Sequence, residues 1–181
     1  YGIDKVRESL EDEVVGKFLK DAIFNEICPT LDLPEEELSQ FSADVLDRFR
    51  NPYLEHALMS ISLNSTSKYK TRVLPSVLEY IKRKNKNPEH LLFSLAALIA
   101  FYRGERGEER FTVKDDQSVL DFFATQWAKG DAASVVKATL KNTAFWGTDL
   151  TQFEGLEETV TNSLECIIMN GMKATLQAFV K

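Results

Sequence analysis

Apolar residues recur at intervals of three and four along most of the chain, which is the spacing of one face of an α-helix. After a short charged helical stretch at 4–12, the first long stripe predicts a helix that Asp12 caps and that runs to about Cys28, where Pro29 stops it. Three glutamates after Pro34 predict a second helix, because proline fits the first turn and carboxylates interact favourably with the positive end of the helix dipole. This helix carries Leu38, Phe41, Val45, Leu46 and Phe49.

The same spacing predicts helices through the rest of the chain. A third helix begins near Pro52 and carries an apolar face of Leu54, Ala57, Leu58 and Ile61. The most apolar helix, at 91–102, is expected at the centre of the fold, and the last, at 156–179, is either continuous or broken at Gly171. Residues 104–116 are polar and contain glycine, which predicts a loop or a short hairpin. No segment shows convincing strand alternation, so the predicted fold class is all-α, with further helices at 74–84, 118–129 and 130–140.

Length and composition narrow the class of protein. A chain of 181 residues is long enough for one domain with a substantial core, and its net charge of −6 argues against general nucleic-acid binding, which leaves a basic surface. No apolar run reaches the roughly 18 residues that a membrane span needs. Cys28 and Cys166 have no CxxC partner and are predicted to be buried, reduced thiols of a cytoplasmic protein. Neither pairs with a histidine at metal-ligand spacing, so no metal site is expected.

The chain begins with Tyr-Gly-Ile and enters helical sequence at once, without an initiator methionine or a signal-peptide pattern. We interpret residues 1–181 as a single helical domain that is a fragment of a longer protein.

One stretch, Arg48–Pro75, departs from the mixed charge of the other helices. Five cations bracket a run of small polar residues, and acids are nearly absent although the chain as a whole is acidic. Hydroxyls, amides and unpaired cations beside apolar residues are typical of a site for a polyhydroxylated or anionic small molecule. The cations are Arg48, Arg50, Lys68, Lys70 and Arg72, and the small polar residues are Ser60, Ser62, Asn64, Ser65, Thr66 and Ser67.

Lys68 is the leading candidate within this stretch. No acid lies within four residues of it on either side, so its ammonium group needs a carbonyl, a water or a ligand; an ordinary surface lysine is the alternative. If the helix from Pro52 continues this far, Lys68 shares one polar stripe with His56, Ser60 and Asn64, which lie four residues apart. The hydroxyl run at 65–67 competes for backbone hydrogen bonds and favours a break there.

The other cations and the remaining motifs carry less information. Lys70 and Arg72 are more typical of surface or interdomain contacts, whereas Arg50, with Arg48 and Asn51, fits a scaffold role and a site role equally well. The chain has no dinucleotide or phosphate-loop fingerprint and no GxSxG or HExxH motif, so motifs predict no catalytic residue within it.

Three segments together identify a resemblance to a known family. They are RFRNPYLEHALMSISLNSTSKYKTRVLP at 48–75, AALIAFYRGER at 96–106 and DLTQFEG at 149–155. In order and spacing they resemble the C-terminal domain of the mannitol dehydrogenase family, the long-chain polyol dehydrogenases, and the likeness covers essentially the whole chain. The resemblance implies a multi-helical domain similar to that of 6-phosphogluconate dehydrogenase. It also implies an N-terminal Rossmann domain, outside residues 1–181, that binds NAD and closes a substrate cleft against this one.

The family likeness also bears on the site. The family's general acid/base is a lysine in a Lys-x4-Asn-x2-His motif, which this chain lacks, so the resemblance implies that the catalytic lysine lies upstream and that no catalytic residue lies here. Lys68 matches a family lysine that contacts substrate oxygens, and Ser60 stands where mannitol-type members have an arginine. Asn64 or Lys70 is then a second donor toward a substrate carboxylate, with His56 and Arg50 as further candidates.

Within the family, the likeness is strongest to members that interconvert D-tagaturonate and D-altronate. The expected partners are therefore a small hexuronate substrate and the protein's own Rossmann domain, with no nucleic acid and no membrane. A mannitol or fructuronate reductase is the alternative of the same class. A non-catalytic helical module, whose basic stretch binds an acidic partner, is the alternative of another class.

Overall fold

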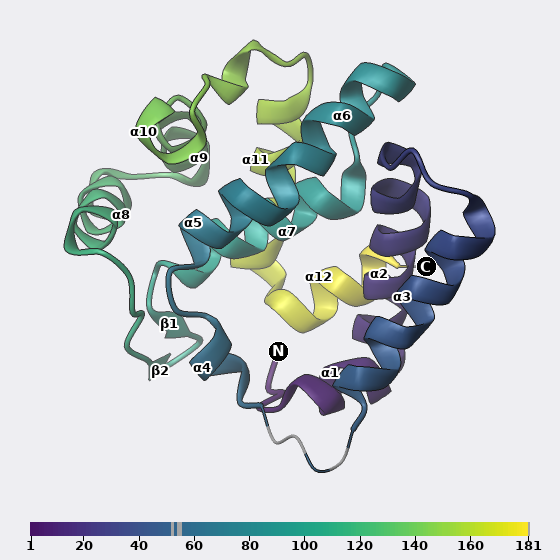
Figure 1. Cartoon of the computed structure of the whole chain (residues 1–181). Helices are drawn as coiled ribbons and strands as arrows, with labels where there is room; N and C mark the ends of the chain where they lie inside the picture. Colours follow the sequence, from purple (N-terminus) through teal and green to yellow (C-terminus); the bar gives the residue numbers. More distant parts are fainter. Residues whose placement is uncertain (52, 54–55, 181) are drawn as a thin grey trace.

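The structure, a computed structural model, describes residues 1–51, 53 and 56–180, and Figure 1 shows how its elements follow one another. The predicted all-α class is confirmed, because helices make up the fold and the strands form one short hairpin at the position predicted for a loop or hairpin. The α-helices are α1 (Val6–Glu11), α2 (Glu13–Asp21), α3 (Glu35–Phe49), α4 (Leu58–Ile61), α5 (Ser65–Lys68), α6 (Leu74–Lys84), α7 (Glu89–Phe101), α8 (Gln117–Lys129), α9 (Ala132–Leu140), α10 (Thr143–Trp146), α11 (Leu156–Asn170) and α12 (Met172–Phe179). The π-helical turns are η1 (Ala22–Ile27) and η3 (Tyr69–Val73), the 3₁₀ turns are η2 (Cys28–Thr30) and η4 (Leu150–Gln152), and the antiparallel strands are β1 (Glu105–Arg106) and β2 (Glu109–Arg110).

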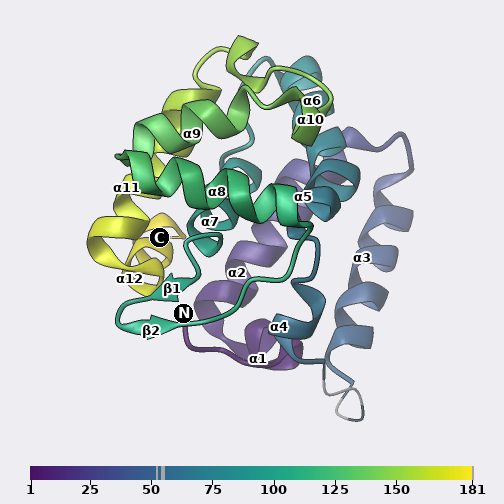
Figure 2. The ribbon, with the colours of Figure 1, turned by 90° about the vertical axis from the view of Figure 1, so that its left-hand side faces the viewer.

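The core is built around α7 and α11, which pack against each other through the middle of the molecule. Helix α7 is apolar all round, as expected for a central helix, and Leu92, Ala96 and Ile99 on it are fully buried. Helix α11 contributes Val160 and Leu164, which are also fully buried. Figure 2 shows α8 and α9 along the face turned toward the viewer and α3 at the edge of the molecule. The prediction of a central helix at 91–102 is therefore confirmed.

The first long helix begins as predicted but ends differently. The carboxylate of Asp12 caps α2 by accepting the backbone N–H groups of Val14 and Val15 at 3.0 and 2.9 Å. The helix then continues beyond Asp21 as the π turn η1 and the 3₁₀ turn η2, so it passes Pro29 and ends at Thr30. Proline is tolerated there because it lies in the first turn of η2.

Helix α3 turns only part of its apolar side inward. Leu38 and Leu46 are buried, whereas Phe41 and Phe49 are 63% and 44% exposed. Two of the apolar residues predicted for this helix therefore face away from the core.

The helix predicted to begin near Pro52 is wrong. Pro52 and Leu54 lie outside the described residues, and Ala57 forms an antiparallel bridge with Lys5 before α4 begins at Leu58. Helix α4 is a single turn, and Ile61, assigned to its apolar face, is 46% exposed. The backbone of this region pairs with residues 4–6, which are far away in the sequence, and local periodicity carries no signal of such a pairing.

At the other end of the chain, the helix predicted at 156–179 is broken at Gly171. This residue has φ 80° and ψ 157°, a conformation that is almost restricted to glycine. Helices α11 and α12 are therefore separate elements.

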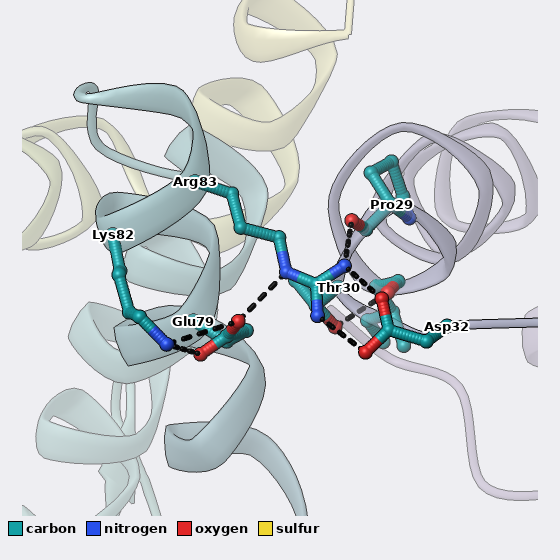
Figure 3. A network of polar contacts seen from close by, with 7 residues as sticks. Pro29, Thr30, Asp32, Glu79, Lys82 and Arg83 are labelled. Atoms are coloured by element: carbon teal, nitrogen blue, oxygen red, sulfur yellow. Dashed lines mark hydrogen bonds and ion pairs between the residues drawn. The ribbon is translucent and has the colours of Figure 1, made fainter.

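The last turn of α6 carries three basic residues, Lys82, Arg83 and Lys84, and Arg83 joins two elements of the fold. Figure 3 shows Arg83 placed between Glu79 on its own helix and Asp32 in the loop after η2. Its guanidinium donates in parallel to both oxygens of Asp32, at 2.8 and 3.0 Å, and to Glu79 at 2.7 Å. Arg83 therefore holds down the pKa of both carboxyl groups and ties α6 to the end of the first helix.

Candidate functional site

The middle of the basic stretch contains the two single turns α4 and α5, and we call residues 57–68 the α4–α5 segment. The helical conformation is interrupted before α5, where Asn64 has a left-handed backbone with φ 53°. Asparagine tolerates this conformation better than most residues. The backbone N–H of Asn64 donates to the carbonyl of Lys114 at 3.1 Å, and its carbonyl accepts the backbone N–H of Lys68 at 3.1 Å. The condition for a single polar stripe, a helix that continues to Lys68, is therefore not met: the helix is interrupted at 62–64, directly before the hydroxyl run at 65–67 that favoured a break.

Lys68 satisfies its ammonium group inside the segment. Its Nζ lies 2.7 Å from the carbonyl oxygen of Ile61, the last residue of α4. A cation in this position interacts favourably with the unpaired carbonyls at a helix C-terminus. The side chain therefore reaches back to the C-terminal end of α4, and only one of its N–H donors is used by this bond.

The hydroxyl groups of the segment also bond to the backbone. Ser60 donates to the carbonyl of Ala57 at 2.7 Å, and Ser62 donates to that of Met59 at 2.8 Å. Because each hydroxyl proton is used, the serine oxygens present lone pairs to the outside. The hydroxyl groups of Ser60 and Ser62, which were predicted to be donors, are therefore available to a ligand as acceptors. Asn64, at the turn, is exposed.

The remaining predicted residues are not drawn into this group by the contacts that they make. His56 precedes α4, its ring is exposed, and its carbonyl accepts the N–H of Val6 at 3.0 Å. Arg50 pairs with Asp47 at 2.9 Å at the end of α3. Lys70 lies on η3 with its Cε 3.9 Å from the position that a Cβ on Gly147 would occupy, so it packs toward the loop after α10.

Tyr102, which the sequence did not single out, lies behind the segment. It is buried at the end of α7, and its hydroxyl accepts the backbone N–H of Thr66 at 3.1 Å and the Thr66 hydroxyl at 2.8 Å. The same hydroxyl donates to the carboxylate of Asp115. Burial, followed by this bond, raises the pKa of Tyr102. One signal was available, because Tyr102 is a hydroxyl-bearing side chain in the otherwise apolar run of AALIAFYRGER.

Apolar side chains are exposed on the same segment. Met59, Ile61 and Leu63 are 49%, 46% and 47% exposed. Long apolar side chains beside a cation and hydroxyl oxygens form a surface that fits a partly apolar, partly hydroxylated ligand or a covering domain.

The segment at 149–155 has a structural role. Asp149 accepts the backbone N–H of Thr151 at 2.9 Å and its hydroxyl at 2.6 Å, and these bonds lower the pKa of Asp149. Leu150 and Leu156, at either end of the turn, are fully buried. This motif therefore anchors the start of α11.

A separate cavity of about 680 Å³ lies between α7, the hairpin and the turn from α11 to α12. Ala97, Ala100, Phe101, Ile167 and Met172 line it, with Tyr1 at its edge. Its apolar lining differs from the α4–α5 segment, and its lining residues include none of the six predicted site residues.

Among residues 1–51, 53 and 56–180, no three or more histidine, cysteine, aspartate or glutamate side chains are grouped so that they could hold a metal ion. None of the helices described is both long and apolar enough to cross a membrane. Cys28 and Cys166 are partly buried free thiols, and Cys28 Sγ lies 3.7 Å from Ser42 Oγ.

Known proteins resemble this chain over nearly its whole length. The altronate oxidoreductase of Enterobacter sp. (strain 638) is 46% identical over 97% of the chain, and that of Yersinia enterocolitica is 44% identical over 98%. The altronate oxidoreductase of Escherichia coli O139:H28 is 42% identical over 97%. The chain spans 38% of the length of each of these proteins.

A solved structure has the same fold. In the ternary complex of Pseudomonas fluorescens mannitol 2-dehydrogenase with NAD and D-mannitol, the matching part superposes with a TM-score of 0.87 at 18% identity. The match covers 99% of this chain and 36% of that one. The family described as mannitol dehydrogenase C-terminal domain matches residues 1–168. The chain therefore belongs to the mannitol dehydrogenase C-terminal domain family.

Proposed function

We propose that this chain is the substrate-side domain of an NAD-dependent oxidoreductase that interconverts D-tagaturonate and D-altronate. The observation that carries the proposal is the 42–46% identity, over nearly the whole chain, to proteins named altronate oxidoreductase. The α4–α5 segment supports it, since it carries an ammonium group with N–H donors to spare and two serine hydroxyl oxygens that can accept, which suits a ligand that has both a carboxylate and several hydroxyl groups.

The full protein, in this proposal, is longer than the chain. An N-terminal Rossmann domain binds NAD and covers the α4–α5 segment, which agrees with the relatives' greater length and with the exposed side chains of Met59, Ile61 and Leu63. The enzyme works in the cytoplasm, where free thiols such as Cys28 and Cys166 remain reduced.

In the proposed reaction, the bound cofactor supplies the redox chemistry: NAD is the hydride acceptor when altronate is oxidised, and NADH is the hydride donor when tagaturonate is reduced. The residues of this chain hold and orient the open-chain substrate. Lys68 keeps its bond to Ile61 and directs a remaining N–H toward the substrate carboxylate or a hydroxyl oxygen, while the Ser60 oxygen accepts from a substrate hydroxyl. Such contacts fix the reacting carbon in position. The proton passes to or from a lysine upstream of Tyr1.

Replacing Lys68 in the full-length enzyme tests this role. Removing one charge-assisted hydrogen bond costs about 1.5–3 kcal/mol, so Lys68→Ala is expected to lower kcat/KM for tagaturonate about 10- to 100-fold. Lys84→Ala, at an exposed position on α6, is the matched control and should leave kcat/KM unchanged. An unchanged kcat/KM in Lys68→Ala would exclude Lys68 from substrate binding.

The substrate itself is tested with the unaltered enzyme. Tagaturonate, fructuronate and fructose are compared as oxidants of NADH at equal concentration. The proposal expects the highest kcat/KM with tagaturonate. A preference for fructuronate or fructose would assign the protein to another branch of the family, and no turnover with any of them would contradict the proposed activity.

A further inference from the structure

The hydroxyl group of Tyr102 is a junction between three parts of the fold. The tyrosine belongs to the end of α7, its hydroxyl accepts two hydrogen bonds from Thr66 on α5, and it donates one to Asp115 in the loop before α8. A phenol has one proton and can accept at its oxygen lone pairs, so this hydroxyl is fully engaged. The two bonds with Thr66 join residues 36 positions apart in the sequence, and the bond with Asp115 joins residues 13 positions apart.

The ring holds this oxygen in a fixed place. Tyr102 is 7% exposed and stacks on Phe123 with the ring centroids 4.2 Å apart and the planes 10° from parallel. Phe101 packs against it edge-on at 5.7 Å. Rotation of the ring away from Thr66 would break contacts in the core, so the oxygen is a rigid anchor.

Asp115 fixes the direction of the Tyr102 O–H bond. One carboxylate oxygen accepts the Tyr102 proton, and the other accepts the backbone N–H of Asp116 at 2.8 Å. Because the phenol proton is directed at Asp115, both lone pairs remain for Thr66. The carbonyl of the preceding residue, Lys114, accepts the backbone N–H of Asn64 at 3.1 Å, so the same loop contacts the α4–α5 segment directly through Lys114 and indirectly, by way of Tyr102, through Asp115.

The α5 helix depends on these contacts. It has only four residues, and a single helical turn is not stable by itself in water. Asn64 and Thr66, in its first turn, are bonded to the 114–115 loop and to Tyr102, and Lys68 at its end bonds back to Asn64. The direction in which Lys68 leaves the backbone is therefore set by the bonds made at Thr66 and Asn64.

We propose that Tyr102, held by Asp115, is a positioning residue for Lys68: it fixes α5 so that the Lys68 ammonium group is held at the carbonyl of Ile61, at the end of α4, where it can bind the substrate. This inference rests on the proposed function. It assigns a role in substrate binding to two residues that do not belong to the basic stretch and do not touch the substrate.

A double-mutant cycle in the full-length enzyme tests this inference. Tyr102→Phe keeps the ring and its stacking but removes all three hydrogen bonds, and it is expected to lower kcat/KM for tagaturonate about tenfold, mainly by raising KM. When Lys68 is already alanine, the same change is expected to lower kcat/KM less than about twofold, because the side chain that Tyr102 positions is gone. A loss of the same factor in both backgrounds would show a general structural effect and overturn the proposal.

Two further measurements separate positioning from loss of stability. Hydrogen exchange at the amides of Thr66 and Lys68 is expected to speed up about tenfold or more in Tyr102→Phe, with exchange in α9 unchanged. Unchanged exchange at both amides would overturn the proposal. Tyr80→Phe, at a tyrosine buried in α6, is the matched control and should change neither kcat/KM nor exchange in α5.

Variants of Thr66 test the hydrogen bond between Thr66 and Tyr102 from the other side. Thr66→Ser keeps the hydroxyl group and should retain most of the kcat/KM that Thr66→Val loses. An equal loss of kcat/KM in both variants would overturn the role of this hydrogen bond.

Failure of this inference can be told apart from failure of the proposed function. Turnover of tagaturonate by the unaltered enzyme tests the function alone. If the enzyme turns over but Lys68→Ala has no effect, Lys68 does not bind the substrate and the positioning role is wrong, while the function stands.

Discussion

Glu26 caps helix α7 through His90. Its Oε1 accepts the backbone N–H of His90 at 2.8 Å and lies 2.8 Å from His90 Nδ1, while its Oε2 accepts the backbone N–H of Leu91 at 2.8 Å. Glu26 is 4% exposed and lies in the π turn η1, 64 residues before His90 in the chain. A carboxylate at a helix N-terminus satisfies unpaired N–H groups and interacts favourably with the helix dipole. The first helix and the central helix are therefore joined by a buried polar contact.

Removing this contact is expected to destabilise the protein strongly. Glu26→Ala leaves two backbone N–H groups without a partner in a buried place, and we expect the free energy of unfolding to fall by about 3 kcal/mol. Urea denaturation followed by circular dichroism measures this change. Glu89→Ala, at an exposed position in the first turn of the same helix, is the control and should cost less than about 1 kcal/mol. Equal effects of the two changes would contradict the capping role of Glu26.

The cap at Asp12 predicts a pH-dependent contribution to stability. The backbone N–H groups of Val15 and Val14 and the hydroxyl of Tyr1 hold the pKa of Asp12 below its ordinary value of 3.8. A carboxyl group whose pKa is lower in the folded state stabilises the protein above its unfolded pKa, and the stabilisation disappears as the pH falls through the folded pKa. Asp12→Ala is therefore expected to cost about 1 kcal/mol at pH 7. The cost should shrink between about pH 5 and pH 2.

Urea denaturation at several pH values in this range measures the free energy of unfolding of Asp12→Ala and of the unaltered protein. Asp44→Ala, at an exposed position in the middle of α3, serves as the control. Its difference in unfolding free energy from the unaltered protein should not shrink in the same way as the pH falls. A difference between Asp12→Ala and the unaltered protein that stayed constant down to pH 2 would mean that the ionised cap does not stabilise α2.

The bond between Arg83 and Asp32 predicts a small, salt-sensitive effect. Arg83→Lys keeps the charge but loses the paired donors that match the two carboxylate oxygens, so the melting temperature should fall slightly. The pair is exposed to solvent, so the difference should become smaller in about 1 M NaCl. Differential scanning calorimetry at both salt concentrations measures it. A fall in melting temperature as large as that in Glu26→Ala would show that the pair is more important than its exposure indicates.

Two glycines give a matched test of backbone conformation. Gly171→Ala places a side chain at φ 80°, which is strained, and should lower the free energy of unfolding by about 1–3 kcal/mol. Gly130 has φ 163°, which is extended, and nothing lies within 4 Å of an added Cβ, so Gly130→Ala should be tolerated. Urea denaturation of both variants decides between them. Equal stability of the two variants would mean that the break between α11 and α12 does not depend on Gly171.

The features that sequence alone predicted are those decided over short distances along the chain. The spacing of apolar residues located the central helix α7, Asp12 and Pro34 marked the starts of α2 and α3, and the glycines at 104–107 marked the hairpin. Each of these signals acts within a few residues, because helix spacing, capping and turns are properties of neighbouring positions. The three quoted segments were also enough to identify the family, which the match to residues 1–168 confirms.

The features that only the tertiary structure decided depend on residues far apart in the sequence. The break at Asn64 is held by Lys114 and Tyr102, and the start of α4 is held by bonds to residues 4–6, so the helix predicted across this region could not form as one piece. For the same reason Lys68 meets the end of α4 and not His56. The six residues predicted for the site remain a prediction, and the contacts that each of them makes could be seen only once these long-range hydrogen bonds were known. Such bonds stabilise short helical turns that local propensity does not support, and no pattern along the chain records them.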